Sequence, residues 1–327
     1  MTMRCSAMDR KRMETRDGFV LVTVLWLLAI LSVIAIGFSH SAMLERRVAW
    51  YGMDQAQAQA MARGAVNRAV LELGRPKQAK PVQFGANNNR PTPRQGQFGD
   101  LLQEGVYSSQ NEDSNTGEDV CMFWIVDCES RISLNDAPQE LLENMKVLGS
   151  SAVNEIMARR ERKDNNQRQR FSHVDEILGT DAGKGIDEEV WYGTAEEEGI
   201  RSLLTVWGTD GLININTASY GVLSMIPGID KNVVARIVAY RMGPDEILDT
   251  QDDRTFSYLF DVSGRIQISA EKLNPIYMYC KTESQLYKIT THATRRRGKI
   301  SAYCTVIVDM QTGKPVIRDW KEGIIGS

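Results

Sequence analysis

The sequence predicts an α+β protein with a long amino-terminal helix, an antiparallel sheet and a helical domain inserted among the strands. Three observations predict this class: an uncharged run over residues 19–38, an internal repeat over residues 132–241, and β-rich segments near the carboxyl end. With 327 residues, 42% hydrophobic and 25% charged, the chain can hold a membrane segment and about two compact units. Its net charge of -3 gives no overall attraction to nucleic acid or anionic lipid.

The uncharged run predicts a transmembrane segment over residues 19–39. As a helix rising ~1.5 Å per residue, Phe19 to Phe38 would span ~30 Å, the hydrocarbon thickness of a bilayer. Residues 1–18 carry five basic side chains against three acidic ones, which favours a cytoplasmic amino terminus, although Arg46 and Arg47 weaken that signal. Residues 40–74 contain no proline and are rich in helix formers, so we expect one continuous helix to Gly74.

Gly18 and Phe19 form a predicted processing site. A secretory leader has its cleavage site after the apolar core, whereas here the glycine precedes the apolar run, so cleavage would remove residues 1–18 and keep the anchor. This arrangement resembles the type IV prepilin class, whose peptidase cuts after a glycine and whose new amino terminus is then methylated. Phe19 would be the first mature residue. Most members have Glu at the fifth mature position, where this chain has Thr23.

One sequence unit occurs twice in the middle of the chain. Residues 132–137 (ISLNDA) recur 81 positions later as residues 213–218 (ININTA). The same offset pairs Leu142 with Leu223, Ile156 with Ile237 and Arg160 with Arg241, and each copy continues to a Phe-Ser step at Phe171 or Phe256. Helical spacing and polar residues that can cap helices predict a helical domain over residues 134–279, inserted between residues 75–133 and 280–327 of a sheet domain.

The expected strands are rich in β-branched and aromatic residues: Val120–Val126, Gln285–Thr294, Lys299–Val308 and Val316–Trp320. The last three predict an antiparallel meander. Residues 75–99, with four prolines, and residues 111–119 are expected to be irregular.

Pro227, Gly228, Ile229 and Asp230 lie between two amphipathic segments and predict a helix-hairpin-helix. In DNA-binding hairpins a second glycine leaves the amides of the following helix free for phosphate. Here Asp230 stands at that position, where its carboxylate would accept from those amides and repel a phosphate. The first copy has Lys146-Val147 in place of Pro227-Gly228. We therefore expect a packing unit and no nucleic acid contact.

An acidic segment after the second hairpin is a candidate metal site. Its oxygen ligands could hold Ca²⁺, although they lack the EF-hand spacing and also fit a solvated loop: Asp245, Glu246, Asp249, Asp252 and Asp253. With three histidines and no nucleophile or glycine-loop motif, the sequence gives no active site, and we do not expect an enzyme.

Four cysteines follow the leader: Cys121, Cys128, Cys280 and Cys304. Cys121 and Cys128 stand seven apart in a strand-like run, so their side chains would point to opposite faces and could not join. Buried thiols and disulfides both remain open interpretations.

Together, the prepilin-like leader, Thr23, the doubled unit and the Pro-Gly-Ile-Asp hairpin resemble the minor pseudopilin K family of the bacterial type II secretion system, from Gly18 onward. The resemblance implies a pilin-like domain with a helical insertion, placed at the tip of a periplasmic pseudopilus, where it initiates assembly and supports export across the outer membrane. The bulk of the insertion favours the tip independently, because a subunit docked above would clash with it. Some family members bind calcium.

The implied partners are minor pseudopilins I and J, the prepilin peptidase, the inner-membrane secretion platform and membrane lipid. The implied location is the bacterial inner membrane, crossed once, with the amino terminus cytoplasmic and the bulk periplasmic. The alternative is a membrane-anchored helix-hairpin-helix DNA-binding protein of a DNA-uptake system.

Overall fold

The computed structural model describes residues 8–74, 101–109, 119–164, 167–181, 183–194, 198–246, 253–295 and 299–326. The chain divides into two compact units, Met1–Gln57 and Ala58–Ser327.

A single helix, α1 (Met8–Leu73), contains both the predicted membrane segment and its predicted continuation. From Phe19 it is long and apolar enough to cross a bilayer, and within the described residues it is the one helix with that property. The expected helix to Gly74 is confirmed. Alanine, leucine, methionine and glutamine favour its part beyond residue 40, and no proline interrupts it.

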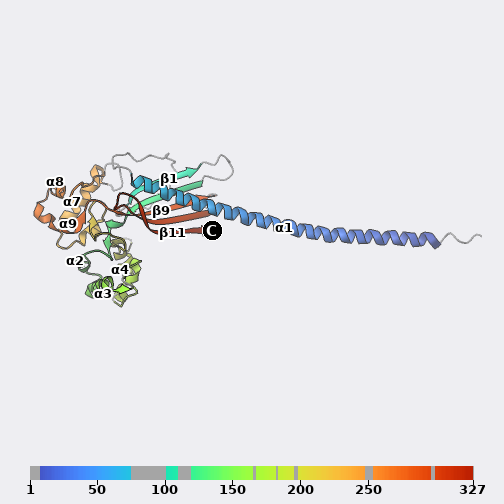
Figure 1. The fold of residues 1–327 in the computed structure, drawn as a ribbon, viewed down its shortest axis with the longest axis horizontal. Coiled ribbons are helices and arrows are strands. Elements are labelled where there is room, and N and C mark those ends of the chain that lie inside the picture. The colour runs from blue at the N-terminus through green and yellow to red at the C-terminus, as the bar shows by residue number, and fades with distance from the viewer. Residues whose placement is uncertain are drawn as a thin grey trace, which may run out of the picture. The chain divides into compact units, whose positions relative to one another are not determined.

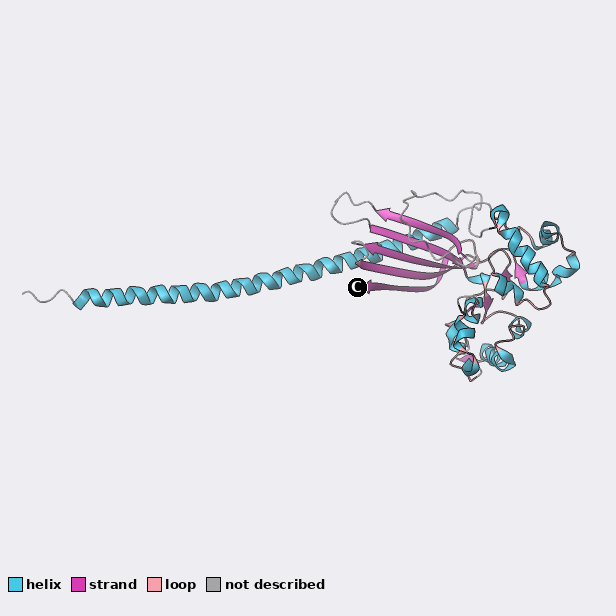
Figure 2. Ribbon diagram, turned by 180° about the vertical axis from the view of Figure 1, so that it is seen from behind, coloured by secondary structure: helices cyan, strands magenta, loops and turns pink. Residues whose placement is uncertain are grey.

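The second unit contains a five-stranded antiparallel sheet in the order β1-β2-β9-β10-β11. Figure 2 shows these strands side by side: β1 (Leu101–Ser109), β2 (Asp119–Asp127), β9 (Leu286–Arg295), β10 (Ile300–Asp309) and β11 (Val316–Gly326). The predicted meander is confirmed as β9-β10-β11. Because β2 pairs with β9, the centre of the sheet joins strands on opposite sides of the long helical insertion.

Small residues on the last turns of α1 allow it to pack closely on one face of this sheet. The buried helix residues are Ala58, Ala62, Ala65, Val66 and Ala69, and they share a core with side chains of β2, β9 and β10. The Thr291 hydroxyl on β9 donates to the Ala62 carbonyl at 3.1 Å, which fixes the helix to the sheet. At the carboxyl end of β9, Arg295 forms a buried ion pair with Asp119 at 2.8 Å.

The insertion lies between β3 (Ile132–Ser133) and β8 (Cys280–Lys281) and gathers beyond one end of the sheet (Figure 1). Its helices are short: α2 (Gln139–Glu143), α3 (Gly149–Glu161), α4 (Glu188–Tyr192), α5 (Ile200–Leu203), α6 (Tyr220–Ser224), α7 (Lys231–Arg241), α8 (Val262–Ile266) and α9 (Asn274–Tyr279). Its other strands are β4 (Lys163–Asp164), β5 (Gln167–Arg168), β6 (Leu204–Thr205) and β7 (Ile213–Asn214). The 3-10 turns are Cys128–Ser130, Val174–Ile177, Gly183–Gly185, Gly243–Asp245, Leu259–Asp261 and Ala270–Leu273.

The two sequence copies have the same internal architecture. In the first, β3 pairs in parallel with β6, and in the second β7 pairs in parallel with β8. Arg160 donates to the carbonyls of Leu134 and Ala137, both at 2.7 Å. Its counterpart Arg241 donates to the Ala218 carbonyl. Each arginine therefore holds the loop that begins its own copy against its second helix.

The copies also contact each other at equivalent positions. Asn144 at the end of α2 donates to the carbonyl of Met225 at the end of α6, at 2.9 Å. Because both copies contribute to a single hydrophobic core, the insertion behaves as one domain built from a duplicated unit.

Candidate functional site

The membrane-type segment of α1 carries apolar side chains that are exposed in the structure, from Phe19 to Phe38. Its two hydroxyls are satisfied within the helix: Thr23 donates to the Val20 carbonyl and Ser32 to the Leu28 carbonyl, each at 2.8 Å. Such local bonds allow a hydroxyl to lie in hydrocarbon without a partner from another chain. The predicted processing step between Gly18 and Phe19 stays a prediction, since only the helical backbone of Gly18 is described.

The predicted hairpin joins α6 to α7. Gly228 has φ of +73°, a left-handed conformation in which a side chain would be strained. The Asp230 carboxylate caps α7 by accepting from the Asn232 amide at 2.9 Å, and Lys272 lies 3.7 Å from its other oxygen. An amide that could face a phosphate is therefore already occupied by a side chain.

The predicted calcium ligands are only partly described. Asp245 ends a 3-10 turn and Glu246 follows it with φ of +58°, whereas Asp249 and Asp252 lie outside the described residues. Asp253 begins the next described segment. Among the described residues, no group of three or more acidic, histidine or cysteine side chains is arranged to hold a metal ion. Calcium binding stays a prediction from the sequence.

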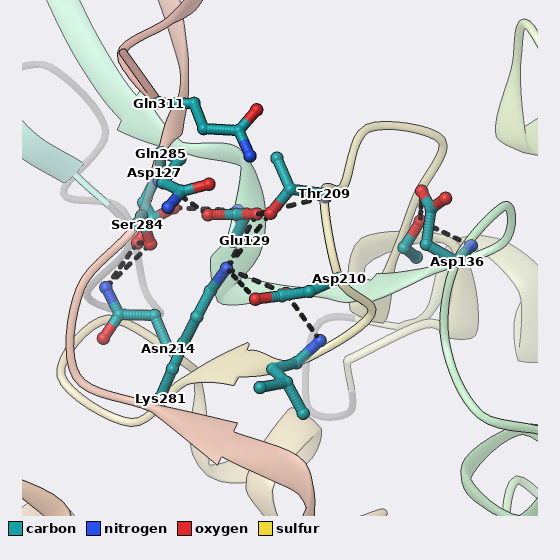
Figure 3. A network of polar contacts seen from close by, with 12 residues as sticks. Asp127, Glu129, Asp136, Thr209, Asp210, Asn214, Lys281, Ser284, Gln285 and Gln311 are labelled. Atoms are coloured by element: carbon teal, nitrogen blue, oxygen red, sulfur yellow. Dashed lines mark hydrogen bonds and ion pairs between the residues drawn. The ribbon is translucent and has the colours of Figure 1, made fainter. Parts of the chain in front are cut away.

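A buried acidic network lies where the sheet meets the insertion (Figure 3). Asp127, at the end of β2, accepts from the Glu129 amide with one oxygen, at 2.8 Å. Its other oxygen accepts from Asn214 at 2.8 Å, Thr217 at 2.6 Å and Ser284 at 2.6 Å. One carboxylate thus connects β2, the start of the second copy and the segment before β9.

Glu129 is the second buried acid of this network. It accepts from the Lys281 ammonium at 2.9 Å and the Gln285 amide at 2.7 Å, and it also accepts from the amide and hydroxyl of Thr209. Lys281 in turn donates to Asp210 at 2.9 Å. All of these groups are supplied by one compact unit and satisfy each other, which is the pattern of a structural junction.

Burial raises the pKa of Asp127, because the charged form loses its hydration, while the hydrogen bonds from Ser284, Thr217, Glu129 and Asn214 act to lower it. Acids with a raised pKa also occur in active sites, but here hydrogen-bond donors surround both oxygens of the Asp127 carboxylate. The network was not predicted from the sequence.

Cys121, Cys128, Cys280 and Cys304, the cysteines of the described residues, are buried and free. The interpretation as buried thiols is therefore confirmed, and the disulfide alternative is not. Burial raises the pKa of Cys121 to about 12 and that of Cys304 to about 11, so neither thiol has appreciable thiolate character near neutral pH.

Comparison with known proteins adds information on the amino-terminal segment. Residues 17–67 match the PilX N-terminal family. No curated protein matches the chain. A chain in the crystal structure of the GspK-GspI-GspJ complex from the type 2 secretion system of enterotoxigenic Escherichia coli is similar over 87% of this chain and 99% of that chain, with 11% identity and a TM-score of 0.45. The family match spans less than half of the chain and lies within α1, so residues 17–67 resemble a pilin-like amino-terminal segment.

Proposed function

We propose that this chain is a minor pseudopilin of a type II secretion system, which lies at the tip of the pseudopilus, initiates its assembly and supports protein export across the outer membrane. The observation that carries the proposal is helix α1. It has a pilin-like amino-terminal sequence, it is apolar enough to span a bilayer, and its last turns, from Ala58, pack on an antiparallel sheet. One helix therefore serves both as a membrane anchor and as the cover of a sheet. A filament subunit that is extracted from a membrane requires this combination.

The helical insertion supports the tip position. A subunit inside a filament is covered by the next one, and a domain of duplicated helices between β3 and β8 would collide with that neighbour. Thr23 gives a second argument. At a tip there is no subunit above to supply an amine, so a Glu at this position would leave an unpaired carboxylate in lipid, whereas the Thr23 hydroxyl is satisfied by its own helix.

The proposed partners are minor pseudopilins I and J, the prepilin peptidase and the inner-membrane platform, in an inner membrane that the chain crosses once with its amino terminus in the cytoplasm. The alternative, a DNA-binding protein of an uptake system, is less well supported because Asp230 occupies an amide at the start of α7 that would face a phosphate.

The function is tested by deletion and complementation. Deleting the gene should leave exported proteins in the periplasm, and the wild-type gene should restore export. Wild-type protein solubilised from membranes should co-purify with minor pseudopilins I and J. Normal export together with lost DNA uptake would overturn the proposal in favour of the alternative.

Processing is tested with Gly18→Val, because a side chain at this position should obstruct the peptidase. The variant should remain a full-length precursor in the membrane. Phe19→Met is the matched control and should still be cleaved, since methionine is also common at the first mature position of prepilins. Removal of residues 1–18 from Gly18→Val, observed by mass spectrometry, would refute the processing site.

A further inference from the structure

The two copies of the duplicated unit differ in charge directly after their second helices. The first copy has Arg162 and Lys163, followed by Arg168 and Arg170, whereas the residues 81 positions after Arg162 and Lys163 are a glycine and a proline. Both copies fold into the same helical arrangement, so the fold does not require these cations. They are a property of the first copy alone.

The cations lie on a short antiparallel hairpin in which two of them face each other. Lys163 on β4 and Arg168 on β5 are direct cross-strand partners. The Gln169 amide extends the pairing by donating to the Arg162 carbonyl at 2.9 Å. Like charges directly opposite in an antiparallel pair destabilise it. Within the described part of the chain, neither Lys163 nor Arg168 has a carboxylate partner, so an anion between them would relieve their repulsion.

A groove of about 470 Å³ runs beside this hairpin, a volume within the range of about 300–1,000 Å³ typical of ligand sites. Four cations and three carboxylates line it: Arg160, Lys163, Arg168, Arg170, Asp136, Glu161 and Asp210. Two of the carboxylates already have cationic partners, because Asp136 pairs with Arg170 at 3.0 Å and Asp210 with Lys281 at 2.9 Å. These two carboxylates are therefore not paired with Lys163 or Arg168, and Glu161 is the third carboxylate of the lining.

We propose that this groove binds an acidic peptide segment of another protein, with ligand carboxylates held by Lys163 and Arg168. The mixed lining favours a peptide over nucleic acid. Duplex DNA carries one charge per about 1.7 Å and is bound through several phosphate contacts to cations, whereas the carboxylates in this lining would repel phosphates. The same carboxylates can accept hydrogen bonds from peptide amides. This site goes beyond the proposed role in the pseudopilus and does not depend on it.

The test uses the full-length protein in non-ionic detergent and a short fluorescent peptide containing several glutamates. We expect saturable binding that weakens as salt is added, and no binding of the same peptide with glutamine in place of glutamate. Lys163→Ala/Arg168→Ala should weaken binding about tenfold or more, as loss of charge-assisted hydrogen bonds predicts. Arg265→Ala/Lys314→Ala removes two exposed cations elsewhere and should bind as the wild type does.

Two measurements keep the outcome decisive. Because Lys163→Gln removes a like-charge repulsion, it should not lower the melting temperature, and it should still weaken binding of the glutamate peptide. A DNA duplex is tested in parallel. Absence of glutamate-peptide binding, equal loss in both double variants, or duplex binding through Lys163 and Arg168 without peptide binding would each overturn the proposal.

Discussion

Asn135 and Asn216 occupy equivalent positions in the two copies and make the same three hydrogen bonds. The Asn135 amide group donates to the carbonyls of Phe171 and Val206, at 3.0 and 2.7 Å, and accepts from the Phe171 amide at 2.8 Å. Asn216 donates to the carbonyls of Phe256 and Thr282, both at 2.9 Å, and accepts from the Phe256 amide at 2.8 Å. Each asparagine thus joins the start of its copy to the Phe-Ser step and to the residue that directly follows the last strand of that copy, β6 or β8.

Asn216→Ala should lower the free energy of unfolding by about 2–4 kcal/mol, because it leaves backbone groups of Phe256 and Thr282 without their partner. Chemical denaturation followed by circular dichroism measures the change. Asn232→Ala is the matched control, since the Asn232 side chain is exposed on α7, and it should change stability by less than about 0.5 kcal/mol. Equal effects would show that the bonds of Asn216 contribute little.

Lys281→Met should destabilise the protein by about 3–5 kcal/mol, because it leaves the buried Glu129 carboxylate without its cation. Lys184→Met is the control. Its ion pair with Asp181 is exposed, so its loss should cost less than about 1 kcal/mol. Adding Glu129→Gln to Lys281→Met should recover part of the loss. If the double variant is no more stable than Lys281→Met, an unpaired buried charge is not the cause.

Asp175→Asn should reduce the loss of stability in acid. Hydrogen bonds from Arg201 lower the pKa of Asp175 below its ordinary value of 3.8; burial opposes this shift, and the Trp191 indole bond adds to it. A carboxylate whose pKa is lower in the folded than in the unfolded state contributes its full stabilisation at pH values above its unfolded pKa. That stabilisation is lost as the pH falls through the folded pKa. The melting temperatures of wild type and variant should therefore converge below pH 3.8. Asp181→Asn, at an exposed position, should retain the wild-type pH profile; a constant gap between wild type and Asp175→Asn would contradict the linkage.

Thr23→Val should preserve export in a complementation assay, because the Thr23 hydroxyl bonds only within its own helix in the described structure. Thr23→Glu should give no gain and should impair initiation of the pseudopilus, since a carboxylate at a tip has no amine to neutralise it. If Thr23→Val abolishes assembly while the protein is still processed and abundant, the hydroxyl has a specific partner and the tip argument from this residue fails.

Patterns of local sequence predicted much of the fold. The apolar run and the helix formers after it predicted α1, and β-branched residues predicted β2 and the meander. Strand β1 was not predicted, because its sequence LLQEGVYSS has no clear alternation and a glycine at its centre.

The contacts between distant residues could not be predicted in the same way. Asp127, Glu129 and Lys281 meet only after the sheet and the insertion have folded, and no spacing in the sequence relates them. Lys163 and Arg168 belong to a charge run that indicates a solvated surface, and only the register of β4 and β5 places them opposite each other. The repeat was visible from Asn135 and Asn216, whereas the two-residue strands that close each copy carry no periodic signal.

The pairing of β2 with β9 determines the order in which the chain can fold as it is synthesised. Asp127 is opposite Tyr287, so the edge of β2 that pairs with β9 must wait for about 160 more residues, or roughly 8–32 s at about 5–20 residues per second. The first copy is complete once Thr205 has emerged and the second once Lys281 has emerged. The insertion can therefore form early, while β2 has β1 as its one available partner strand, and Phe123 and Ile125 on β2 still lack the core that β9 and β10 complete. During that time the edge of β2 that faces β9 is open, and a stop between Lys281 and Leu286 would yield a folded insertion beside a two-stranded hairpin with an aggregation-prone edge.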